Sequence, residues 1–195
     1  TLTQEQSITK GASPPAQQVG WSREEKIAEW FVSEEANRRT LSKPIALEKK
    51  GQIISPTLDF KLTAQVDRVD INQDGKAIIY DYKTGAVPNK NVQLHFDKQL
   101  LLLALIIEDG GFSDIAPLSV SNASFIDLTN KKEIFAPFDQ ESLETHRGKL
   151  HLLIERYLSP AQGFTARRAM FQVEDISDYD GISRFGEWST QDKAQ

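Results

Sequence analysis

The chain has 195 residues, a formal net charge of −5 and no cysteine, which suits a single domain with its own core and excludes disulfides, thiolate metal sites and cysteine-ligated iron–sulfur clusters. Its longest apolar run, Leu100 to Ile107, is too short to cross a membrane, and residues 1–20 lack the apolar stretch of a signal peptide, so we expect a cytoplasmic protein. The acidic balance gives no general attraction to nucleic acid, although a local basic patch stays compatible with DNA binding.

The N-terminal part of the chain is predicted to be a tail followed by a helix. Residues 1–20 are polar and are expected to form a flexible tail or the remnant of a linker. A helix is expected from Ser22 to Arg39, because Ser22 and Glu25 form a capping-box pattern before apolar residues at helical spacing. The folded domain is expected to cover residues 21–189, with residues 190–195 as a second tail.

The middle of the chain alternates strand-like and helix-like patterns. Turn residues at Asn72 to Gly75 predict an antiparallel hairpin between two strands, and Asp139 is a plausible N-cap for the last helix. The order of elements predicts an α/β fold with a mixed central β-sheet flanked by helices. The predicted strands are residues 45–49, 59–71, 76–84, 118–128 and 133–138, and the predicted later helices are residues 92–109 and 139–158.

The predicted hairpin carries the residues that point to chemistry. Asp81 and Lys83 are two residues apart at the end of an apolar strand, so their side chains point to the same face. Asp67 on the neighbouring strand falls roughly opposite Asp81, and cross-strand neighbours approach to about 5 Å. Two carboxylates this close repel each other unless a cation lies between them or one takes up a proton.

A hard cation such as Mg²⁺ suits such a pair, because it uses one or two carboxylates and leaves its other positions to water and phosphate. The metal activates water, and Lys83 is placed to orient the attacking hydroxide or to stabilise charge on the phosphate. The alternative interpretation is a surface ion pair on a hairpin, since an isolated Asp-x-Lys sequence is common. The facing aspartate and the apolar strand favour a site.

Other residues near the hairpin have two interpretations each. Glu48 is a further candidate metal ligand or a solvent-facing strand residue. Gln99, Tyr82 and Arg68 are candidates for contacting DNA or supporting the site. The three histidines lack the spacing of a metal site and are expected at the surface. The pair Arg167-Arg168 is a candidate phosphate contact or a solvated pair.

The segment Asp70 to Gly75 opens like an EF-hand calcium loop, with Asp81 at its twelfth position. An EF-hand has helices on both sides of the loop, whereas the flanking sequences here are strand-like. Residues 72–75 are therefore interpreted as turn residues, and calcium binding is not expected.

Three segments together resemble the RecB-like branch of the PD-(D/E)XK nucleases: Leu62 to Asp70, Ile79 to Gly85, and Gln99-Leu100. More narrowly, the chain resembles the C-terminal nuclease domain of alphaproteobacterial-type AddB, a helicase–nuclease subunit. The helix around Trp30 to Arg39 and the stretch Asp178 to Ser189 contribute to this resemblance. It covers roughly residues 21–189 and implies a restriction-endonuclease-like fold.

The resemblance implies roles for individual residues. Asp67 and Asp81 match the metal ligands, and Lys83 matches the catalytic lysine. Gln99 matches the glutamine of a Gln-x-x-x-Tyr motif in which Leu103 replaces the tyrosine. The family's upstream histidine or glutamate is not found before Trp21, and Glu48 is a candidate for partly replacing it.

The same resemblance implies a cofactor and partners. Mg²⁺, or Mn²⁺ in vitro, is the expected cofactor, DNA the expected substrate, and an AddA-type helicase the expected partner of the full-length parent. No iron–sulfur cluster is expected, because the family's cluster-binding cysteines are absent. The alternatives are a non-catalytic DNA-binding or scaffolding domain on the same fold and, less consistent with the sequence, a calcium-binding module.

Overall fold

The protein is described by a computed structural model covering residues 14–137, 139–162, 180–183 and 187. A five-stranded sheet of order β1-β2-β3-β4-β5 forms its centre, with β3 and β4 parallel and the other neighbours antiparallel. The strands are β1 (Ser42–Ile54), β2 (Lys61–Asn72), β3 (Ala77–Lys83), β4 (Val120–Asp127) and β5 (Lys132–Phe135). The predicted mixed sheet is confirmed.

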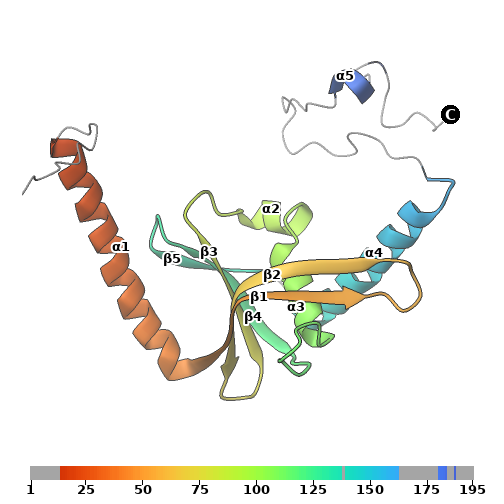
Figure 1. The fold of residues 1–195 in the computed structure, drawn as a ribbon, viewed down its shortest axis with the longest axis horizontal. Helices are drawn as coiled ribbons and strands as arrows, with labels where there is room; N and C mark the ends of the chain where they lie inside the picture. Colours follow the sequence, from red (N-terminus) through yellow and green to blue (C-terminus); the bar gives the residue numbers. More distant parts are fainter. Residues whose placement is uncertain (1–13, 138, 163–179, 184–186, 188–195) are drawn as a thin grey trace, which may run out of the picture.

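Helices flank this sheet, as predicted. Helix α1 leads into β1 and leans away from the sheet toward its N-terminal end, whereas α3 lies behind the sheet with α4 beyond it (Figure 1). The helices are α1 (Pro14–Leu41), α2 (Lys90–His95), α3 (Gln99–Glu108), α4 (Gln140–Leu158) and the short α5 (Asp180–Ser183). No helix in the described part of the chain is both long and apolar enough to cross a membrane.

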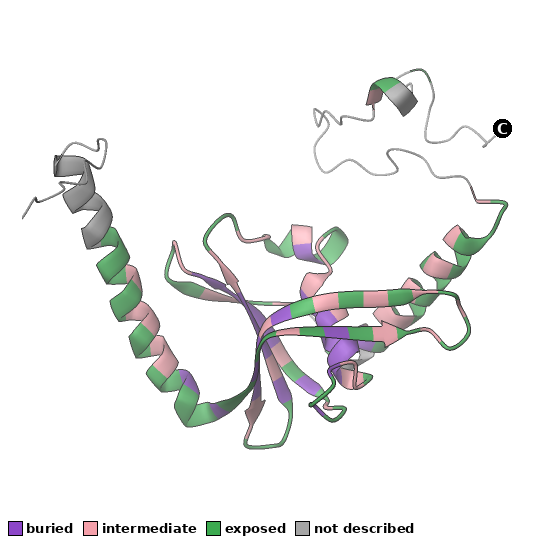
Figure 2. Ribbon diagram, in the orientation of Figure 1, coloured by how far each residue is buried: buried purple, intermediate pink, exposed green. Residues whose placement is uncertain are grey.

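The core lies between α3 and the sheet. All residues of α3 from Leu103 to Ile107 are buried, so this helix is apolar on almost every side. It packs against inward residues of the sheet such as Val69, Ile79 and Phe125, and against Leu143 of α4. Figure 2 shows this as a band of buried residues where α3 crosses the strands. The rigid core thus positions the first turn of α3 next to the end of β3.

Two predicted helix boundaries were wrong. Helix α1 begins at Pro14 rather than Ser22, so the capping-box pattern lies inside the helix. Proline is well tolerated in the first helical turn, where its missing N–H has no helical partner. The predicted helix over residues 92–109 is two helices, because Asp97 Oδ1 accepts a hydrogen bond from the Gln99 backbone N–H at 3.0 Å and starts α3 anew.

The β1–β2 hairpin turns relative to the rest of the sheet near Asp67. The inward residues of β2 are Ala64 and Val66 before this point and Val69 after it, so the alternation shifts by one. Opposite Asp67, between the partners of Val66 and Arg68, Glu48 has a φ of 47°. This left-handed conformation is uncommon for a residue with a side chain, and it marks the bend.

The predicted turn after β2 is confirmed. The Asn72 side chain accepts hydrogen bonds from the backbone N–H groups of Asp74 and Lys76, and Gly75 has a φ of 74°. Both flanks of the turn are strands, which excludes an EF-hand. The hairpin of β4 and β5 and the N-cap of α4 by Asp139 are also confirmed.

The predictions for the C-terminal part fall mostly outside the described residues. These include Arg167, Arg168, the irregular segment after Gln162 and most of the stretch 178–189.

Candidate active site

Asp81 lies at the centre of a polar cluster at the end of β3. Its side chain is only 4% exposed. One carboxylate oxygen, Oδ1, accepts a hydrogen bond from Gln99 Nε2, and the Lys83 ammonium lies 2.7 Å from the other, Oδ2. Lys83 Nζ also donates to Gln99 Oε1 at 3.2 Å. The Gln99 amide therefore holds the carboxylate and the ammonium together from the first turn of α3.

Asp67 lies across the hairpin from Asp81. Strands β2 and β3 are antiparallel neighbours, as predicted, and the last printed register pair is Arg68 with Tyr80. The same register continued by one residue sets Asp67 opposite Asp81, and directly opposed residues share a face of the sheet. Asp67 Oδ2 accepts a hydrogen bond from the Tyr82 backbone N–H at 2.8 Å. This contact anchors the Asp67 carboxylate at the point where β2 leaves the sheet.

The pKa of Asp81 is raised above its usual value. Burial is the main cause, because it disfavours the charged carboxylate. The Lys83 ammonium works against this shift, and the negative charges of Asp67 and Asp97 reinforce it. A raised carboxyl pKa beside a second carboxylate indicates a place where an added cation stabilises the ionised form.

Asp97 is a part of this environment that our sequence analysis missed. It lies in the break between α2 and α3, close enough for its charge to affect Asp81, and its carboxylate receives the Gln99 N–H. The sequence contained a usable signal: an aspartate two residues before Gln99 is a common helix-start pattern. The apolar run that follows obscured this signal.

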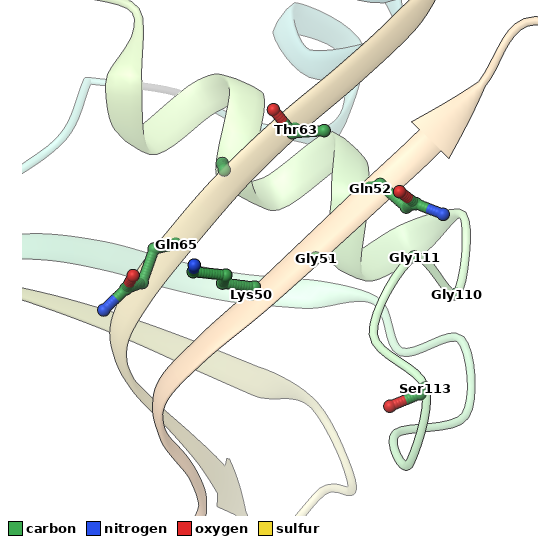
Figure 3. Close-up of a pocket in the computed structure, with 9 residues that line it drawn as sticks. Lys50, Gly51, Gln52, Thr63, Gln65, Gly110, Gly111 and Ser113 are labelled. Carbon is green, nitrogen blue, oxygen red and sulfur yellow. The ribbon is translucent and has the colours of Figure 1, made fainter.

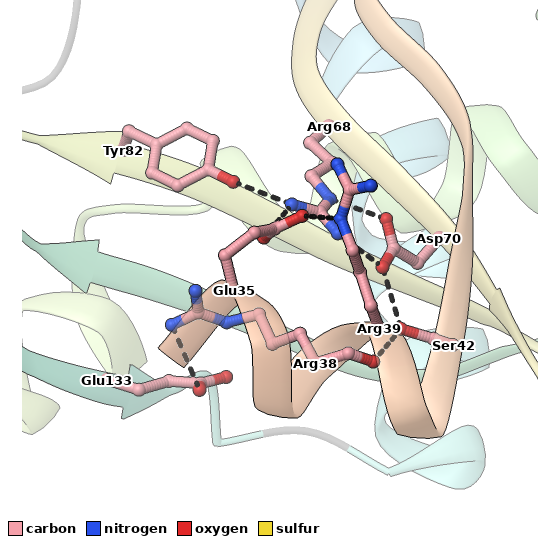
Figure 4. A network of polar contacts seen from close by, with 8 residues as sticks. All are labelled: Glu35, Arg38, Arg39, Ser42, Arg68, Asp70, Tyr82 and Glu133. Carbon is pink, nitrogen blue, oxygen red and sulfur yellow. Dashed lines mark hydrogen bonds and ion pairs between the residues drawn. The ribbon is translucent and has the colours of Figure 1, made fainter. Parts of the chain in front are cut away.

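Arg68 and Tyr82 lie on the opposite face of the sheet from the candidate site. The Arg68 guanidinium is buried and binds the Asp70 carboxylate through two nitrogens, at 2.6 and 2.8 Å. It also contacts Glu35 of α1 at 2.5 Å and the Tyr82 hydroxyl at 3.4 Å (Figure 4). The Tyr82 ring packs edge-on against Phe31. This placement favours support of the fold over direct contact with DNA.

The same network attaches α1 to the sheet. The Tyr80 ring has the guanidinium of Arg38 on one contact and that of Arg68 on another, at 5.5 and 5.4 Å from its centroid. Burial raises the pKa of Glu35, but hydrogen bonds from Arg68 and Arg39 outweigh it and the net shift is downward. The α1 helix is therefore held by charged groups as much as by apolar packing.

Comparison with known proteins gives the family. A family model for the PD-(D/E)XK nuclease superfamily matches residues 3–175, which include the whole cluster around Asp81. The chain belongs to the PD-(D/E)XK nuclease superfamily.

Similar curated proteins come from Rickettsia and are themselves uncharacterized. A protein of Rickettsia bellii is 28% identical over 152 residues, which cover 68% of this chain and 18% of that protein. A protein of Rickettsia conorii is 31% identical over 93 residues, covering 46% of this chain and 11% of that protein. This PD-(D/E)XK chain thus spans less than a fifth of the length of these relatives.

The residues at Asp81 fit the divalent metal that PD-(D/E)XK nucleases generally use. The donors are carboxylate oxygens, which suit hard cations such as Mg²⁺. Apart from its ion pair with Lys83, the buried Asp81 Oδ2 receives no hydrogen bond from a described residue. Within the described ranges, no group of three or more acidic or histidine residues is placed to hold a metal. Two carboxylates are sufficient for Mg²⁺, which keeps several waters.

The remaining candidates of this PD-(D/E)XK domain lie away from the cluster. The exposed Glu48 accepts a hydrogen bond from Gln65 Nε2 at 2.8 Å, and its role as a metal ligand stays a prediction. His95 and His151 are exposed at helix surfaces. His146 contacts the Ser142 carbonyl oxygen one turn earlier in α4, at 2.7 Å. The histidines therefore occupy helix faces, as predicted.

Proposed function

We propose that this chain is a metal-dependent deoxyribonuclease domain that hydrolyses phosphodiester bonds, with Mg²⁺ as its ion and Mn²⁺ as a substitute in vitro. The observation that carries the proposal is the environment of Asp81. This carboxylate is buried, faces Asp67 and has a raised pKa. A surface ion pair, the alternative explanation, leaves its carboxylate hydrated, and strongly perturbed pKa values concentrate at functional sites.

Each residue of the cluster has a definite task in this proposal. Asp67 and Asp81 hold the ion, which supplies an activated water and neutralises charge on the phosphate. Lys83 places its ammonium beside Asp81 and stabilises negative charge that develops on the phosphate oxygens. Gln99 fixes Lys83 and Asp81 relative to each other, and the Tyr82 N–H fixes the Asp67 carboxylate.

We further propose that the domain belongs to the RecB-like branch and to an AddB-type subunit. In this proposal the full-length parent works with an AddA-type helicase in recombinational repair of double-strand breaks. The support is the order of Asp67, Asp81-x-Lys83 and Gln99 in the sequence. The length of the Rickettsia relatives is consistent with a nuclease domain inside a larger protein.

The experiment is a cleavage assay on the full-length parent with labelled single-stranded DNA at millimolar Mg²⁺. Asp81→Ala is expected to abolish cleavage and to leave DNA binding largely intact, since affinity comes mostly from phosphate contacts. Lys83→Ala is expected to act in the same way, and Lys76→Ala, in the exposed turn, serves as the control. Cleavage by Asp81→Ala at the wild-type rate contradicts the proposal.

A second candidate is a DNA-binding or scaffolding domain without catalysis. It is favoured by the small number of metal ligands, since the described residues offer only a pair of carboxylates at the cluster. It predicts that the full-length parent binds DNA but shows no Mg²⁺-dependent cleavage that depends on Lys83.

A further inference from the structure

A second hollow lies beside the candidate active site, on the β1–β2 hairpin. It is a groove of about 800 Å³, bounded by the hairpin and by the loop that follows α3 (Figure 3). Its side chains are polar, and none of them is a carboxylate. We call it the hairpin groove; its lining is Lys50, Gly51, Gln52, Thr63, Ala64, Gln65, Gly110, Gly111 and Ser113.

The groove is built by a close approach of two backbones. The Gln52 backbone N–H donates to the Gly111 carbonyl oxygen at 2.9 Å, which seats the loop on the edge of β1. A Cβ on Gly111 would collide with the Gln52 carbonyl, and a Cβ on Gly51 would lie 2.6 Å from the Phe112 ring. Both positions therefore need glycine, so the wall of the groove is a defined part of the fold.

Charge distinguishes the hairpin from the rest of the molecule. Residues 42–66 contain four lysines and two acidic residues, although the whole chain carries a net charge of −5. The two nearest carboxylates are engaged: Glu48 accepts from Gln65, and Asp114 pairs with Lys49 at 2.5 Å. Lys50 is exposed and forms no ion pair with any residue that the structure describes.

The position of the groove connects it to the candidate site. Gln65 precedes Asp67 by two residues on β2, a separation of about 7 Å along a strand. Side chains two apart in a strand point to the same side. A polymer whose reacting bond lies at Asp67 and Asp81 therefore has a direct path onto the hairpin.

We propose that the hairpin groove binds the sugar–phosphate backbone of the nucleic-acid strand that extends from the candidate active site. This proposal rests on the proposed nuclease function and names the path of its substrate. Neutral amide and hydroxyl groups, backbone amides and lysine are the groups that contact phosphates in protein–DNA complexes. The groove offers these groups without an opposing carboxylate in its lining.

The test measures binding of a fluorescein-labelled oligothymidylate to the 195-residue chain by anisotropy, in EDTA so that no cleavage occurs. Two groove variants, Lys50→Glu and Thr63→Glu, are compared with Lys76→Glu, which makes the same charge change in the exposed turn after β2. We expect the groove variants to bind about tenfold more weakly, and Lys50→Glu to lower the salt dependence by about one phosphate contact. Lys76→Glu is expected to stay within about twofold of wild type.

A crosslinking experiment tests the location directly. Because the chain has no cysteine, Thr63→Cys or Lys76→Cys creates a single attachment point for a thiol-reactive aryl azide. On illumination, the label at position 63 is expected to crosslink to the oligonucleotide, and the label at position 76 is not.

The outcomes separate this proposal from the proposed function. Equal binding by the groove variants and Lys76→Glu, equal crosslinking from both positions, or no binding by the wild-type chain overturns the groove. The proposed function is decided independently by cleavage in the full-length parent and its dependence on Asp81.

Discussion

Gln99 donates a hydrogen bond from its side-chain amide to the Asp81 carboxylate, joining the first turn of α3 to the end of β3. The same amide accepts from Lys83, so one side chain orients both partners of the ion pair. Groups that orient a metal ligand typically contribute 10- to 100-fold to metal affinity or activity. The predictions below concern this cluster and the elements that hold it.

Gln99→Ala should lower kcat/KM for cleavage of single-stranded DNA by the full-length parent by about 10- to 100-fold. The reason is that Lys83 and Asp81 lose the amide that fixes their relative position. Gln73→Ala, in the exposed turn between β2 and β3, is the matched control and should leave the rate unchanged. Equal rates for the two variants would show that Gln99 has no positioning role.

Asp97→Asn and Asp97→Ala should have different effects on cleavage. Both variants remove a negative charge that raises the pKa of Asp81, so both should shift the acidic limb of the rate–pH profile to lower pH. Only the alanine variant loses the acceptor for the Gln99 N–H, and it should lose about 1 kcal/mol of stability. Rate–pH profiles and thermal melts of both variants test this, and identical behaviour contradicts it.

Asp81→Asn should be more thermostable than the wild-type chain at pH 8. The pKa of Asp81 is raised in the folded state, mainly by burial, so folding favours the protonated form. Stability from this group is fully present below the unfolded pKa and is lost as pH rises through the folded pKa. The Tm advantage of the variant should therefore shrink from pH 8 to pH 4. An advantage that grows toward acid contradicts the assignment.

Mg²⁺ should raise the Tm of the wild-type chain at pH 8 but not that of Asp81→Asn. A ligand that binds only the folded state stabilises it by mass action, and the variant lacks one of the two carboxylates. Differential scanning fluorimetry across a Mg²⁺ titration measures both. A similar increase in the two proteins would place the metal elsewhere.

Arg68→Met should cost about 3 kcal/mol in the free energy of unfolding, measured by urea titration. Arg68 is 3% exposed, and its removal leaves the fully buried Asp70 carboxylate with the Ser42 hydroxyl as its remaining printed partner. Arg39→Met removes an exposed arginine from the same Glu35 and should cost about 0.5 kcal/mol or less. Equal costs would indicate that the network does not hold α1.

Much of the candidate site followed from local sequence patterns. The turn at Asn72 to Gly75 fixed the register of β2 against β3, and strand alternation then set Asp81 and Lys83 on one face. These inferences need only short-range geometry, which a sequence records directly. The alternation of Tyr82 to the other face was predicted for the same reason.

What the sequence did not reveal depends on tertiary contacts. The left-handed backbone at Glu48 has no local cause such as glycine and follows from the bend of the hairpin. The network of Arg68 with Glu35 joins residues 33 positions apart, and no periodicity indicates it. The new start of α3 at Gln99 depended on one side chain, Asp97, within a segment whose apolar pattern is otherwise continuous.

Strand β3 serves two masters in turn: its odd-numbered residues face α3, and its even-numbered residues face α1. Deleting a single residue within Ala77–Lys83 would exchange the two sets, bringing the tyrosines to the metal side and the carboxylate to the arginine network. The loops on either side of the strand are free of this restriction. Among related chains, insertions and deletions should therefore accumulate before Ala77 and after Lys83, while the seven residues between them keep their number.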